Sequence, residues 1–223
     1  MWRNFVFKRH LIVLGVCVLL LGTMASVAAF AKSSPSTASR ATKSKTIAVV
    51  PFEYDPGHTM IVDADWTTGQ GLPDQTGNKN MALLLTKIGP TSTNAASGAT
   101  ITNVKGITLT ELGFDVRSDG HCGAGAPRFD VVTNDGTDHF AGCAAAITTP
   151  AGTDSEGNTW LRKRFDLSSA STNVYPPFTT GETVKSIEIV FDEGIDTGTD
   201  YKGWTYLDNI DINGTLIGQG TNS

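Results

Sequence analysis

The chain has 223 residues and a formal charge of −5, but seven of its 17 basic residues lie in the first 46 positions, which contain no acidic residue. Residues 47–223 therefore carry 10 basic against 22 acidic side chains, a net charge of −12. Such a surface repels phosphate backbones, so nucleic acid is excluded as a partner and cations are favoured.

The first 31 residues are typical of a secretory signal peptide. Three basic residues precede an apolar run over 11–30, and Ala29-Phe30-Ala31 has the small-x-small pattern of a cleavage site. We expect cleavage after Ala31 and a secreted, extracellular protein without a membrane segment. The alternative is a retained anchor, because 20 apolar residues can span a bilayer.

A disordered linker is predicted for residues 32–46. This stretch contains Ser, Thr, Ala, Lys and Arg with one Pro, and it cannot bury enough apolar surface to offset the entropy of ordering. Residues 47–223 then form one domain with one core.

The mature chain predicts an all-β domain. Apolar residues alternate with polar ones in short runs bounded by Gly, Asp, Asn, Pro or Thr, and no run keeps a helical period over three turns. Many short strands without helices between them indicate a single β-sandwich of two antiparallel sheets, of the jelly-roll kind. The candidate strands are 46–51, 60–63, 81–87, 99–101, 107–117, 128–133, 138–143, 159–166, 183–191, 205–212 and 216–217.

One hairpin can be assigned a register. Asp135-Gly136 matches a two-residue primed turn, which would pair Thr133 with Asp138 and continue outward from there. Paired residues share a face. The core face would then hold Phe129, Val131 and Phe140, and the outer face Arg128, Asp130, Val132, His139, Ala141 and Cys143.

The same alternation assigns faces in two other strands. Leu112, Phe114 and Val116 are expected inside, with Glu111, Asp115 and Arg117 outside; Ile187, Ile189 and Phe191 are expected inside, opposite Glu188 and Asp192.

Cys122 and Cys143 remain after cleavage, and in an oxidising compartment an even pair predicts a disulfide. The same cysteines with His121 and His139 would also suit a tetrahedral zinc ion, but the spacing is loose and the disulfide is favoured. A bonded Cys122 could not act as a thiol nucleophile.

The order of the strands resembles that of carbohydrate-binding modules of families 4, 9 and 22, the galactose-binding-like β-jelly-rolls. The similarity is carried by Phe52-Glu53, Trp66, the runs 81–86 and 109–117, Trp160 before 164–167, and the runs 186–191 and 205–212. Segment 119–130 departs from that pattern. The resemblance implies a structural calcium ion held by Glu53 and Asp208, to which further oxygen ligands must be added. The alternative is that both are surface acids.

A ligand site is predicted on the outer face of the 128–143 hairpin. Arg128, Asp130 and His139 would be its polar groups, joined by Arg117 if the sheet continues that way, and Trp160 is a candidate aromatic platform. Trp66, Trp204, Tyr175 and Tyr201 are further aromatic candidates. The alternative is an ordinary solvated face with the tryptophans in the core.

Two further features have simple interpretations. Gly120, Gly123 and Gly125 lack the Lys-Ser/Thr of a phosphate loop and indicate a tight bend. Asp192, Glu193, Asp196 and Asp200 lack the spacing of an EF-hand, and we expect them to form a flexible acidic loop.

The function predicted from these features is non-catalytic binding of a polysaccharide or cell-surface glycan. The alternative is a structural or adhesive extracellular protein without a soluble ligand. A hydrolase using paired carboxylates such as Asp115 and Glu188 is disfavoured, because any half-exposed sheet supplies such pairs.

Overall fold

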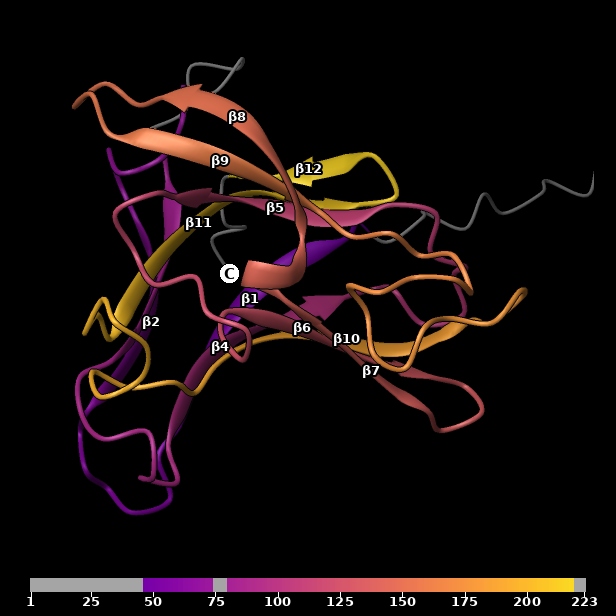
Figure 1. Cartoon of the computed structure of the whole chain (residues 1–223), viewed down its shortest axis with the longest axis horizontal. Helices are drawn as coiled ribbons and strands as arrows, with labels where there is room; N and C mark the ends of the chain where they lie inside the picture. The colour runs from indigo at the N-terminus through magenta and orange to yellow at the C-terminus, as the bar shows by residue number, and fades with distance from the viewer. Residues whose placement is uncertain (1–45, 74–79, 219–223) are drawn as a thin grey trace, which may run out of the picture. The chain divides into compact units, whose positions relative to one another are not determined.

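The computed structural model describes residues 46–73 and 80–218, and it is all-β, as predicted. Two antiparallel sheets pack face to face, so the fold is a β-sandwich (Figure 1). The predicted signal peptide and all but the last residue of the predicted linker lie outside the described residues. Within the described part of the chain, no helix is long and apolar enough to cross a membrane.

The first sheet has five strands in the order β1-β4-β10-β6-β7, and every neighbouring pair is antiparallel. A backbone bridge between Phe140 and Tyr175 extends its β7 edge. The strands are β1 (Ala48–Tyr54), β4 (Ala96–Thr102), β10 (Val184–Phe191), β6 (Arg128–Thr133) and β7 (Asp138–Gly142).

The second sheet has seven strands, with the order β2-β3-β11-β5-β9-β8 and a short β12 on β11. Its members are β2 (Val62–Thr67), β3 (Ala82–Lys87), β11 (Trp204–Ile212), β5 (Leu112–Arg117), β9 (Thr159–Arg164), β8 (Ile147–Thr153) and β12 (Thr215–Ile217). A 3-10 turn, η1 (Cys143–Ala145), connects β7 to β8.

The core lies between the sheets and follows the predicted alternation. Phe114 of β5 packs on Phe129 of β6 with ring centroids 5.4 Å apart, and Phe165 closes the group. Ile187 and Ile189 of β10 are fully buried beside them. Burying a side chain of this size contributes about 1.5–3 kcal/mol, so this interface holds the sandwich together.

The outer face of the second sheet is covered rather than solvated. Asp115 and Arg117 point away from the core, as expected, yet both are buried. Trp160 pairs with Arg117 across β5 and β9 and packs there with Leu72 and Ala82 in a small second cluster. The segment after β2 contributes Leu72 to this cover, and no strand pattern predicts that.

The observed register of the β6–β7 hairpin differs from the predicted register by one residue. Thr133 and Thr137 bond across a three-residue loop, in which Gly136 has a φ of 94°. This is the type I turn with a left-handed glycine rather than the two-residue primed turn. Val131 therefore pairs with His139, and every residue of β7 changes face. His139 is interior at 1 % exposure, and Phe140 is 42 % exposed.

The Cys122–Cys143 disulfide is confirmed, with the two Cα atoms 5.2 Å apart. It joins the loop before β6 to the turn after β7. Closing a loop of this length stabilises the fold by about 3 kcal/mol in the chain-entropy account. Because both sulfur atoms are bonded to each other, neither the zinc set nor a Cys122 nucleophile is formed.

Replacement of Asp154 should destabilise the second cluster in a pH-dependent way. The buried Asp154 carboxylate accepts hydrogen bonds from Trp160 Nε1 at 3.0 Å and from the backbone of Glu156 and Asn158. Burial raises the pKa of Asp154, but these bonds outweigh it and the net pKa is lowered. We expect Asp154→Asn to cost about 1–3 kcal/mol at neutral pH, measured by urea unfolding, because its amide cannot replace every accepted bond.

The difference in free energy of unfolding between wild type and Asp154→Asn should shrink as the pH falls below about 3.9. A carboxyl group whose pKa is lowered in the folded state stops contributing to stability once it is protonated. Asp166→Asn, at an exposed site after β9, is the matched control. An equal loss at neutral and acid pH would contradict the role of the charge.

Candidate functional site

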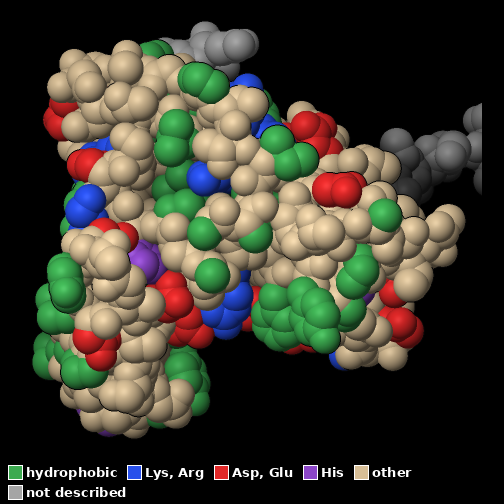
Figure 2. All heavy atoms as spheres, viewed as in Figure 1, with side chains coloured by type: hydrophobic (Ala, Val, Ile, Leu, Met, Phe, Trp, Pro, Cys, Tyr) green, Lys and Arg blue, Asp and Glu red, His purple; other side chains and the backbone are tan. Residues whose placement is uncertain are grey.

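A hollow of about 680 Å³ opens at one end of the first sheet, where β1 and β10 end and β4 and β6 begin. Figure 2 shows acidic and basic side chains gathered at the recess between the lower-left lobe and the rest of the molecule. We call this hollow the groove. Its lining comprises Tyr54, Lys87, residues 91–96, Gly125, Arg128, Asp192 and Glu193.

Arg128 is the central cation of the groove. Its Nε lies 2.8 Å from Asp130 Oδ1, and its Nη1 lies 2.7 Å from Asp192 Oδ1 and 2.8 Å from the carbonyl of Gly125. The side chain is 18 % exposed. Burial lowers the pKa of Arg128, but the two carboxylates outweigh it and raise the pKa overall. The guanidinium is therefore charged and held in one orientation.

Strand alternation explains why these groups meet. Arg128 and Asp130 occupy the outer positions of β6, with Phe129 and Val131 inside. Val190 pairs with Arg128, so Asp192, two residues further along β10, reaches the same outer face. Burial raises the pKa of Asp130, and the charge of Arg128 opposes that rise without cancelling it.

Exposed aromatic rings flank this polar floor. Tyr54 lines the groove at the end of β1. On the other side the Phe140 ring centroid lies 5.9 Å from Arg128 Cζ. Tyr175 exchanges two backbone bonds with Phe140, at 2.8 and 2.9 Å, so both side chains share a face. Tyr175 is 78 % exposed.

The predicted ligand residues divide among three places. Arg128 lines the groove and Asp130, its ion-pair partner, lies next to it on the same face, as the alternation of β6 indicated. His139 lies inside the sandwich, where Nδ1 is 2.7 Å from the carbonyl of Pro176 and the ring stacks on Phe178 at 4.1 Å. The one-residue register difference put it there and brought Phe140 to the site instead.

Arg117 and Trp160 belong to the other sheet. The Arg117 guanidinium stacks on Tyr206 at 4.1 Å and bonds Asp119 and Gln70. Trp160 is fully buried, so its ring cannot serve as a platform for a ligand. Tyr54 was missed in the sequence because nothing in the run before it marks its strand as the edge of a hollow.

The structure does not bring Glu53 and Asp208 together. Glu53 shares a hollow with Val62 at the start of β2. Asp208 follows Leu207, which lies level with Trp66 near the end of β2. Val62 and Trp66 are four residues apart on β2, so about 13 Å of strand separates the level of Glu53 from the level of Asp208.

The surroundings of Asp208 do not fit calcium binding either. Its carboxylate oxygens accept the backbone N–H groups of Leu72 at 2.8 Å and Asn209 at 2.6 Å. A Ca²⁺ ion needs oxygen ligands pointed at it, and these oxygens point at donors. One calcium ion held by Glu53 and Asp208 therefore does not fit this arrangement.

Lys87 ties the acidic loop to the groove wall. Its ammonium donates to the carbonyls of Thr91, Thr93 and Asp192 at 2.7–3.0 Å. Asp196 accepts from the backbone and hydroxyl of Thr91. Burial lowers the pKa of Lys87, and the charges of Asp192 and Asp196 oppose that shift. The loop expected to be flexible is thus held at several points.

Lys87→Met should destabilise the protein by about 2–3 kcal/mol, because three carbonyls lose a charged donor. The free energy of unfolding in urea measures this effect. Lys185→Met, at an exposed position of β10, provides the control for loss of a positive charge. Equal stabilities of the two variants would show that the ammonium does not hold the wall.

Comparison with known proteins gave no match: no family model, no curated protein and no solved structure is similar enough to count as a relative of this chain.

Proposed function

We propose that this protein is a secreted, non-catalytic module that binds a polysaccharide or cell-surface glycan in the groove. The observation that carries the proposal is the Asp130–Arg128–Asp192 network, whose Arg128 and Asp192 line the same hollow as Tyr54, with Phe140 and Tyr175 beside Arg128 outside the lining.

The chemistry of the groove suits a sugar. Sugars offer hydroxyl groups that both donate and accept, and apolar C–H faces that stack on aromatic rings. Carboxylate oxygens accept from hydroxyls, and a guanidinium donates to them. Because the charges of the floor are already paired, a neutral ligand can use these groups without bringing a counter-charge.

The distribution of charge also argues against anionic ligands. The lining contains two carboxylates, Asp192 and Glu193, and its Lys87 is directed at backbone carbonyls. A phosphate or polyuronate is negatively charged and would be repelled by the negative potential of these carboxylates. Hydrolysis is not proposed, because Asp115 is buried and paired with Arg162 on the outer face of the other sheet.

The alternative is a structural or adhesive extracellular protein. It is favoured by the disulfide and by the pairs Asp115–Arg162 and Asp211–Arg164 on the second sheet, in which the carboxylates are buried. These features stiffen the fold without serving a ligand, and this alternative predicts that no soluble glycan binds.

Affinity electrophoresis and calorimetry against a panel of neutral glycans test the proposal. We expect at least one glycan to bind, and Tyr175→Ala to weaken binding about tenfold, equivalent to 1.4 kcal/mol, by removing an exposed stacking surface. Arg128→Ala should abolish detectable binding.

Leu216→Ala removes an exposed apolar side chain on β12 of the second sheet and should bind like wild type. Tyr175→Ala leaves the ion pairs intact, so it remains informative if Arg128→Ala fails to fold. Failure of every glycan to bind would favour the structural alternative. Equal binding by Tyr175→Ala and Leu216→Ala would place the site elsewhere.

Calcium stays part of the proposal without the Glu53–Asp208 pair. It is supported by the charge of −12 on residues 47–223, whereas the described residues contain no cluster of three or more acidic or histidine side chains placed to hold a metal ion. We expect the melting temperature to rise with calcium up to about 5 mM, compared with a chelator, since extracellular sites bind in the 0.1–1 mM range. Magnesium is the control, and unchanged melting in calcium would rule out a stabilising ion.

A further inference from the structure

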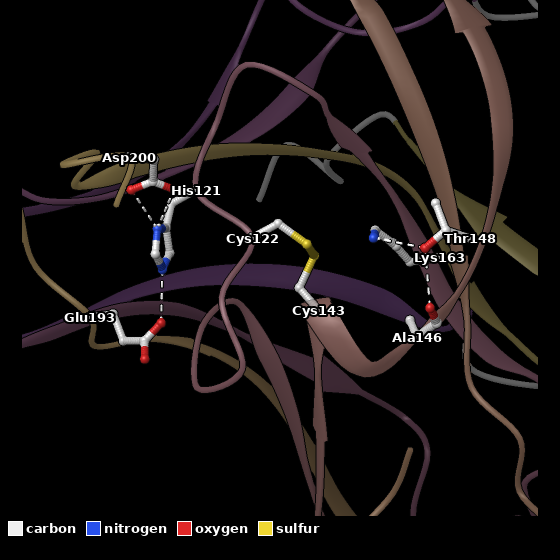
Figure 3. The surroundings of a disulfide bond; sticks show 8 residues. All are labelled: His121, Cys122, Cys143, Ala146, Thr148, Lys163, Glu193 and Asp200. Atoms are coloured by element: carbon white, nitrogen blue, oxygen red, sulfur yellow. Dashed lines mark hydrogen bonds and ion pairs between the residues drawn. A yellow bond between two sulfur atoms is a disulfide. The ribbon is translucent and has the colours of Figure 1, made fainter. Parts of the chain in front are cut away.

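His121 lies at the wall of the groove between two carboxylates (Figure 3). Its Nδ1 is 2.9 Å from Asp200 Oδ2, and its Nε2 is 2.8 Å from Glu193 Oε2. The side chain is 2 % exposed, and its ring meets Phe191 edge to face. It follows β5 in the chain, whereas both partners come from the acidic loop, residues 192–203.

Donation of both bonds by the histidine requires a proton on each of its ring nitrogens. An ionised carboxylate accepts hydrogen bonds and donates none. Burial raises the pKa of Asp200, but hydrogen bonds from the Lys202 N–H and from His121 outweigh it, so the pKa of this carboxyl is lowered overall. With both carboxylates ionised, each ring nitrogen donates one of these bonds, which is the imidazolium form.

Glu193 connects this pair of bonds to the groove. It lines the hollow, and it directly follows Asp192, the partner of Arg128. The backbone closes around it: a Cβ at Gly123 would lie 2.3 Å from Glu193 Oε2, and one at Gly125 would lie 2.6 Å from Oε1. The glycines of segment 119–130 thus make room for this carboxylate.

The loop that carries His121 is itself anchored. The adjacent Cys122 is bonded to Cys143, which is fully buried (Figure 3). The Gly125 carbonyl accepts from Arg128. The backbone that carries His121 is therefore fixed, and the acidic loop, which Lys87 and Thr91 also hold, reaches it through the side chains of Glu193 and Asp200.

The charged groups around the ring come from three elements. The acidic loop supplies Glu193, Asp200 and Lys202, of which Lys202 lies beside Asp200. Strand β6 supplies Arg128, which is paired with Asp130 and Asp192. Strand β3 supplies Lys87, directed at carbonyls of the loops.

We propose that His121 is a positioning residue, which holds Glu193 and the acidic loop against the groove only while its ring is doubly protonated, so that ligand binding weakens as the pH rises. The effect on binding rests on the proposed function, whereas the effect on the loop does not.

The direction of the pH dependence follows because both partners of the ring, Glu193 and Asp200, are hydrogen-bond acceptors. When the ring loses one proton, the bare nitrogen lone pair faces a carboxylate, and one of the two links is replaced by repulsion. The link is thus complete at pH values below the titration of the ring and lost above it.

Amide hydrogen exchange of residues 194–203, corrected for intrinsic rates, measures the loop in the whole mature chain. Raising the pH from about 5 to about 9 should reduce protection at least tenfold in wild type, in step with the histidine NMR signal of His121. Calorimetry with a glycan that binds wild type should show a parallel fall in affinity.

Two variants separate positioning from a general structural role. His121→Gln cannot donate from two opposed nitrogens, so its loop should exchange fast at all pH values. In Asp200→Asn the amide nitrogen can donate to a neutral ring while its oxygen keeps the Lys202 bond, so the loop should stay protected at high pH. His58→Gln, at an exposed position, should match wild type.

A loop that stays protected in wild type while the His121 ring titrates would overturn the proposal, and so would an Asp200→Asn loop that opens as in wild type. If the loop opens with pH but no glycan binds at any pH, the positioning role of His121 stands and glycan binding fails. If glycans bind equally at both pH values and protection is constant, glycan binding stands and the inference about His121 fails.

Discussion

The register of the β6–β7 hairpin decides which side chain of β7 stands beside Arg128 at the groove. Gly136 takes a left-handed conformation that closes a three-residue loop, and Asp135 stabilises it by accepting from Thr137 N–H and from the Thr133 hydroxyl. With this register Phe140 stands beside Arg128 on the outer face, and His139 packs inside on Phe178. A two-residue loop would exchange the two, burying an aromatic ring and bringing a histidine to the groove.

The excess of acidic residues is managed by placing a few cations where carboxylates converge. Arg128 lies between Asp130 and Asp192, Lys87 holds the carbonyls around the acidic loop, and His121 lies between Glu193 and Asp200. Buried pairs of this kind add little net stability, because desolvation offsets attraction, but breaking one leaves an uncompensated charge. They therefore specify one arrangement of the groove.

The alternation of apolar residues predicted the sandwich and the core positions of β5, β6 and β10, because a strand with one buried face shows period two in its sequence. The signal-peptide pattern of the sequence, which predicts export, also predicted the disulfide. The hairpin register was wrong because Asn-Asp-Gly suits both a two-residue and a three-residue loop, and nothing local separates them. The burial of Trp160 depends on Leu72, which lies some 90 residues away in the chain, so no local pattern reports it.

Segment 119–130 departs from the carbohydrate-binding pattern, and its glycines, histidine and cysteine can be explained together. Gly123 and Gly125 admit the Glu193 carboxylate, His121 binds it, and Cys122 fixes the backbone between them. Each feature alone looks like a tight bend, a buried histidine or a stabilising bridge. A disulfide used only for stability would not need two glycines shaped around an acid from another loop, so the three are better explained together, as a support that sets one wall of the groove.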